Sequence, residues 1–99
     1  MRLNSRERAA IHEAVRETFG PEARVRLFGS RLDDTARGGD IDLHIEASGD
    51  PDELMDAELR LAPRLQRALG ERRIDLVVHP VGAAPRPIDR HALETGVLL

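Results

Sequence analysis

Residues 40–46 have the sequence Asp-Ile-Asp-Leu-His-Ile-Glu, in which polar and apolar side chains alternate at every position. Such alternation is typical of a β-strand with one face on a hydrophobic core. We therefore expect Ile41, Leu43 and Ile45 to face the core and the even-numbered residues to face the other side.

Two further segments alternate in the same way. Residues 24–28, Arg-Val-Arg-Leu-Phe, lead directly into Gly29-Ser30, and residues 73–79 contain the sequence Ile-Asp-Leu at 74–76. Both segments have the length of ordinary strands. The sequence thus predicts three strands.

Three helices are expected, because capping residues, prolines and glycines mark their ends. They lie between Asn4-Ser5 and Gly20-Pro21, between Asp50-Pro51 and Gly70, and over residues 89–95. Pro63 lies inside the second helix and is expected to kink it or split it in two. A short helix is expected in the polar stretch 31–39. The predicted order is α-β-(short α)-β-α-β-α, a mixed sheet flanked by helices in one α+β domain over residues 1–99.

The composition excludes several functions. The chain has 99 residues, a net charge of −3 with interleaved signs, no cysteine, and two aromatic residues of the Phe, Trp and Tyr type. Broad electrostatic binding to nucleic acid or to an anionic membrane is therefore not expected, nor is thiol chemistry or a base-stacking surface. No apolar run has the length of a membrane span or the character of a signal peptide, so we expect a cytoplasmic protein.

Three aspartates occupy the middle of predicted strands, where Asp is normally uncommon. Asp40 and Asp42 share one strand face, with Cα atoms roughly 7 Å apart. Asp75 has the same Ile-Asp-Leu-like setting on the last strand. If the two strands are neighbours, three carboxylates converge into a site suited to two Mg²⁺ or Mn²⁺ ions. The alternative is a solvated strand face.

Gly29-Ser30 is a candidate anion site, because glycine lets a ligand approach the backbone and the N–H groups of a following turn bind phosphate. Arg31 and Arg37 are candidate phosphate contacts. An ordinary turn with surface arginines is the alternative. We expect the four histidines to be exposed, with His44 and His79 near the rim of the carboxylate site.

The combined pattern resembles the DNA polymerase β-type nucleotidyltransferase superfamily. It consists of Leu-Phe-Gly-Ser at 27–30, Gly-Asp-Ile-Asp-Leu at 39–43 and Ile-Asp-Leu at 74–76, with nine residues between Ser30 and Asp40. The length and the stretch from Gly29 to Leu43 are similar to the minimal nucleotidyltransferase (MNT) branch. The nine-residue spacer is at the short end of the superfamily pattern.

The resemblance implies a nucleotidyltransferase fold and Mg²⁺-dependent transfer of a nucleotidyl group from a nucleoside triphosphate, expected to be ATP. It assigns two Mg²⁺ ions to Asp40 and Asp42, with Asp75 completing the catalytic site. It assigns triphosphate binding to Gly29 and Ser30, with Arg31 beside them.

The MNT branch further implies an antitoxin that adenylylates and so neutralises a HEPN ribonuclease toxin in a hetero-oligomer. A hydroxyl of that partner protein is the expected acceptor. Two alternatives stay open: a non-catalytic antitoxin that acts by binding alone, and a small-molecule transferase of the aminoglycoside-modifying kind.

Overall fold

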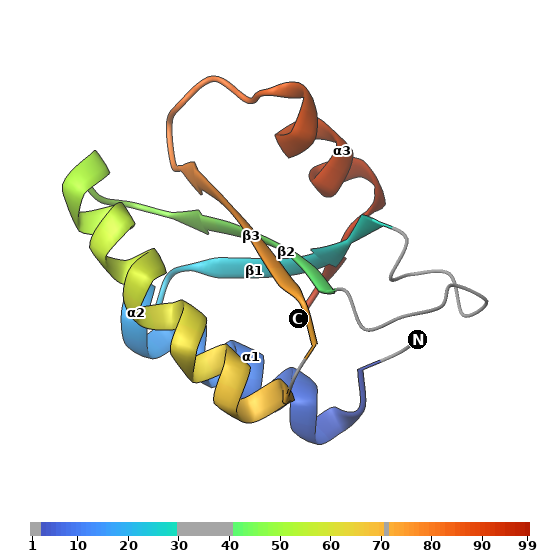
Figure 1. Cartoon of the computed structure of the whole chain (residues 1–99). Helices are drawn as coiled ribbons and strands as arrows, with labels where there is room; N and C mark the ends of the chain where they lie inside the picture. The colour runs from blue at the N-terminus through green and yellow to red at the C-terminus, as the bar shows by residue number, and fades with distance from the viewer. Residues whose placement is uncertain (1–2, 30–40, 71) are drawn as a thin grey trace.

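One mixed β-sheet contains all three predicted strands and a short fourth one (Figure 1). The structure is a computed structural model that describes residues 3–29, 41–70 and 72–99. The predicted short helix within 31–39 lies outside these residues. The strands have the order β3-β2-β1-β4 and are β1 (Arg24–Phe28), β2 (Ile41–Ala47), β3 (Ile74–Pro80) and β4 (Val97–Leu98).

The sheet is mixed because β2 pairs antiparallel with β1 and parallel with β3, while β4 pairs antiparallel with β1. A parallel pair needs a long crossover connection, and the helix between β2 and β3 provides it. The predicted strand β1 has the bounds expected, whereas β3 begins one residue later than expected. The pairing of β4 with β1 was not predicted, since two residues carry no alternation.

The described residues form three helices: α1 (Ser5–Phe19), α2 (Pro51–Leu69) and α3 (Pro87–Thr95). The predicted caps of the first two are confirmed. In α1 the Asn4 side chain accepts a hydrogen bond from Glu7 N at 2.8 Å, and Asp50 accepts from Glu53 N at 2.8 Å in α2. In each pair the glutamate carboxylate accepts a hydrogen bond in return, which completes a capping box.

The sequence predicted that Pro63 kinks the second helix or splits it in two, and the helix is not split, because α2 is continuous from Pro51 to Leu69. Pro63 lies on the exposed side of the helix. Its missing N–H leaves the carbonyl of Leu59 without an intrahelical donor, and Leu59 is 69% exposed, so water can satisfy that carbonyl. Burial of Leu61 and Leu65 on the opposite side holds the helix together.

α1 and α2 lie side by side over one face of the sheet and enclose the core (Figure 1). The odd-numbered residues of β2 are buried there, as predicted. The core also contains residues at helical spacing from both helices: Ile11, Ala14, Val15, Leu54, Leu61, Leu65 and Leu69. The fold is therefore a small α+β domain with a mixed sheet, which confirms the class expected.

α3 covers the other face of the sheet, next to β1 (Figure 1). It begins two residues earlier than predicted, at Pro87, and its Ala92 is fully buried. The sheet therefore has helices on both faces, and part of its polar face is buried. None of the helices in the described residues is long and apolar enough to cross a membrane.

Candidate functional site

Asp42 and Asp75 are direct partners in the parallel pair of β2 and β3. Neighbouring strands lie about 4.8 Å apart, and register partners project to the same face of a sheet. The two carboxylates therefore lie on one face, as the sequence predicted for neighbouring strands. Burial of Ile41 and Leu43 on the opposite face fixes this orientation, because a slip by one residue would expose both of them.

Asp42 and Asp75 differ in their surroundings. Asp42 lies near the start of the inner strand β2 and is partly buried, whereas the Asp75 side chain is 49% exposed on the edge strand β3. The Nε atom of Arg73 lies 3.6 Å from Oδ1 of Asp75. Asp75 is thus the carboxylate that a molecule in solution can reach.

Gly29 lies against the Asp42 carboxylate. It follows β1 directly and has a φ of 78°, which side chains other than hydrogen rarely permit. A Cβ atom at this position would lie 2.6 Å from Oδ2 of Asp42. The sequence predicted Gly29 as a site residue, and the structure brings its backbone together with Asp42.

Three predicted site residues, Asp40, Ser30 and Arg31, lie outside the described residues, and so does Arg37. The described part of the site is therefore Gly29, Asp42 and Asp75.

This donor set suits a hard cation. The two aspartates offer only oxygen ligands, which are the ligands that Mg²⁺ and Mn²⁺ prefer. Two negative charges about 5 Å apart repel each other by about 1–3 kcal/mol, depending on how much water screens them. A bound divalent cation would remove this repulsion, so the residues fit the metal that the resemblance implies.

The prediction that His44 and His79 are exposed is wrong. His44 is fully buried and His79 is 7% exposed, because α3 and the loop before it cover this part of the sheet. Nε2 of His44 lies 2.9 Å from Oδ1 of Asp89, which is itself fully buried. His12 and His91 are exposed, as expected.

Arg86 holds the buried Asp89 carboxylate. Its backbone N and its Nε donate to Oδ2 of Asp89 at 2.8 Å and 2.9 Å, and its Nη2 donates to Val78 O at 2.9 Å. The hydrogen bonds from Arg86 and from His44 hold the pKa of Asp89 well below its usual range, against the opposing effect of burial. This network fastens α3 to the polar face of the sheet.

The alternation of polar and apolar residues in the strands does not predict this network, because it assigns the polar face of the sheet to solvent. Two residues indicate that another element covers this face. Phe28 and Val77 are apolar although they lie on the face where the other strand residues are polar. Phe28 is 4% exposed, and its ring meets the edge of His44 with centroids 6.3 Å apart.

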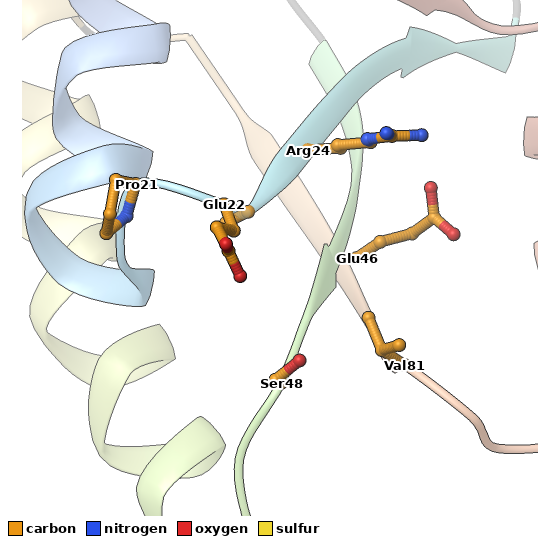
Figure 2. A pocket seen from close by; sticks show the side chains of 7 residues that line it. Pro21, Glu22, Arg24, Glu46, Ser48 and Val81 are labelled. Atoms are coloured by element: carbon orange, nitrogen blue, oxygen red, sulfur yellow. The ribbon is translucent and has the colours of Figure 1, made fainter.

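A separate hollow of about 620 Å³ opens at the far ends of β1 and β2. Figure 2 shows Arg24 and Glu46 at its wall, projecting to the same side from neighbouring strands. Glu46 is already paired with Arg26. Asp42 and Asp75 do not line this hollow, so the carboxylate pair forms a different site.

No protein-family model matches this chain, and no curated protein is significantly similar to it.

Proposed function

We propose that the chain is a Mg²⁺-dependent nucleotidyltransferase with the fold of the DNA polymerase β-type superfamily. One observation carries this proposal. Asp42 and Asp75 are register partners, and the backbone of Gly29 lies against the Asp42 carboxylate. The two halves of the motif, Gly-Ser and Asp-Ile-Asp, are separated by nine residues in the sequence. Gly29 from the first half lies against Asp42 from the second.

In this proposal Asp40, Asp42 and Asp75 hold the metal, and Gly29, Ser30 and Arg31 bind the triphosphate of ATP. Mg²⁺, when bound, offsets the negative charge of the phosphates and of the reacting oxygens. Gly29 contributes by having no side chain, so that a phosphate can approach the backbone beside Asp42.

The reaction transfers AMP. The acceptor oxygen forms a bond to the α-phosphorus, while the bond from that phosphorus to pyrophosphate breaks and pyrophosphate takes the electron pair. The proton of the acceptor hydroxyl passes to Asp75. Exposure of 49% makes this carboxylate the more accessible of the two.

The proposed acceptor is a hydroxyl on a partner protein, a HEPN ribonuclease toxin that the modification neutralises in the cytoplasm. These 99 residues contain no tyrosine, so a tyrosine acceptor must belong to the partner. Val97 and Leu98 support protein binding, since they are 44% and 53% exposed on the edge strand β4. Leu99 packs against the core instead.

The test combines the purified chain, Mg²⁺, α-labelled ATP and the protein encoded by the adjacent gene. We expect label on the partner with the wild type and with Asp56→Asn, a control that removes an exposed carboxylate on α2. We expect none with Asp42→Asn.

Other results would favour the alternatives. Full neutralisation of the partner by Asp42→Asn would favour an antitoxin that acts by binding alone. Efficient labelling of a small alcohol, with none on the partner, would favour the aminoglycoside-modifying kind of transferase.

A further inference from the structure

Three potential metal ligands meet beneath α3. His44 and Asp89 are fully buried and His79 is 7% exposed. One ligand atom from each side chain lies within 4.8 Å of the other two. The three residues come from three elements, β2, β3 and α3. The ring centroids of His44 and His79 lie 6.0 Å apart.

The hydrogen bonds of His79 leave one of its nitrogens available. Nε2 lies 3.0 Å from the carbonyl oxygen of Ala83, and a carbonyl only accepts, so Nε2 carries the proton. Nδ1 therefore has a lone pair. It is buried and has no hydrogen-bond partner among the described residues.

His44 is in a similar position. Its Nε2 faces Asp89, and its Nδ1 is buried with no partner in the described part of the chain. Either neutral tautomer therefore leaves Nδ1 unsatisfied, and a buried polar atom without a partner typically costs about 1–3 kcal/mol. Metal binding at Nε2 requires the neutral tautomer with its proton on Nδ1, and the metal ion then replaces the hydrogen bond between Nε2 and Asp89.

The surrounding groups match the outer shell of a metal site. Metal-binding histidines typically donate their other N–H to a carbonyl or a carboxylate, as His79 does to Ala83. Arg86 fixes the Asp89 carboxylate by donating to Oδ2 from its backbone N and its Nε and to Oδ1 from its Nη2 at 3.1 Å, with Oδ1 next to His44.

We propose that His44, His79 and Asp89 bind one transition-metal ion of the zinc type. Two imidazoles and one carboxylate form a ligand set that suits Zn²⁺, Co²⁺ or Cu²⁺ better than Mg²⁺. Ligand atoms around a tetrahedral zinc ion lie roughly 3.3 Å apart, so the cluster must contract by up to about 1.5 Å. This site is distinct from the Asp42–Asp75 pair and does not depend on the proposed transferase activity.

The test is a titration of the chelator-treated wild-type chain with Co²⁺, followed by displacement with Zn²⁺. We expect one equivalent of Co²⁺ to produce the visible absorption of a low-symmetry site, and Zn²⁺ to abolish it. Excess Mg²⁺ should have no effect.

Matched variants locate the site. His79→Gln and His44→Gln place an amide near the position of Nε2, which keeps a donor for Ala83 or Asp89 and removes the ring. Loss of an outer-shell group typically lowers metal affinity roughly 10–100-fold, and each of these variants should lower the affinity for Zn²⁺ by at least that factor. His12→Gln and His91→Gln change exposed residues and should bind as the wild type does.

Absence of stoichiometric Co²⁺ binding by the wild type would overturn the proposal, and so would unchanged binding by the double variant His44→Gln/His79→Gln. Because core variants can fail to fold, imidazole ¹⁵N shifts of the wild type give a second measurement. Addition of Zn²⁺ should move the resonances of His44 and His79 and leave those of His12 and His91 in place. The opposite pattern would contradict the assignment.

Discussion

Gly29 and Gly70 both have a positive φ, of 78° and 79°, but different surroundings. A Cβ atom on Gly29 would meet the Asp42 carboxylate at 2.6 Å, whereas nothing lies within 4 Å of one on Gly70. The two glycines therefore separate the effect of backbone strain from the effect of crowding at the proposed site.

We predict that Gly29→Ala and Gly70→Ala each destabilise the fold, by on the order of 1–3 kcal/mol, because both force alanine to a positive φ. In Gly29→Ala the new methyl group meets the Asp42 carboxylate. This crowding should displace the carboxylate and greatly reduce Mg²⁺-dependent transfer in Gly29→Ala, but not in Gly70→Ala.

Urea unfolding and label transfer, measured on both variants, check this prediction. Wild-type transfer by Gly29→Ala would show that the contact between Gly29 and Asp42 is irrelevant to activity.

At the scale of elements, α2 and α3 are the two helices whose behaviour the sequence predicted incompletely. Pro63 was expected to break α2 or kink it, and the helix is continuous. The cause is tertiary: Leu61, Leu65 and Leu69 pack on the core from one side, while Pro63 stays on the exposed side. Local propensity is outweighed by burial here.

We predict that Pro63→Ala stabilises the protein, by on the order of 1–3 kcal/mol, since proline in a helix interior costs about 3 kcal/mol relative to alanine. The substitution restores an N–H donor for the carbonyl of Leu59 and removes no buried contact. Thermal and urea unfolding measure the gain. A lower stability than that of the wild type would mean that Pro63 has a packing role that its exposure does not indicate.

The attachment of α3 should depend on pH through Asp89. Its pKa is lowered in the folded state, so the unfolded state binds the proton more readily, and the stabilisation is complete above the usual carboxyl pKa. It is lost as the pH falls below that value. The asparagine variant lacks this titration.

We therefore predict that the stability difference between the wild type and Asp89→Asn is large at about pH 6 and shrinks towards about pH 3. Urea unfolding at a series of pH values, with a chelator present, gives this difference. A constant difference over that range would contradict the role of the ionised carboxylate, because all other acidic groups are common to both proteins.

For the molecule as a whole, strand alternation and helix caps were sufficient to predict the elements of the α+β class. The register of Asp42 with Asp75 needed one further fact, that β2 and β3 are neighbours, which no local pattern contains. The burial of His44 was unpredictable from alternation, since it depends on where α3 docks. The pairing of Val97 with Leu27 is likewise long-range and involves a strand of two residues.

The whole fold should respond to nucleotide through mass action, because a ligand that binds only the folded state stabilises it. At about ten times its Kd, Mg²⁺-ATP would contribute about 1.4 kcal/mol. A domain of this size gains roughly 4–8 °C in Tm for each kcal/mol.

The most direct test of the central claim, that Asp42 and Asp75 form a site for Mg²⁺ and nucleotide, is the Tm of matched variants with and without Mg²⁺-ATP. We predict an increase of several degrees for the wild type and for Asp56→Asn, and none for Asp42→Asn/Asp75→Asn. An equal increase in Tm for the double variant and the wild type would contradict the claim.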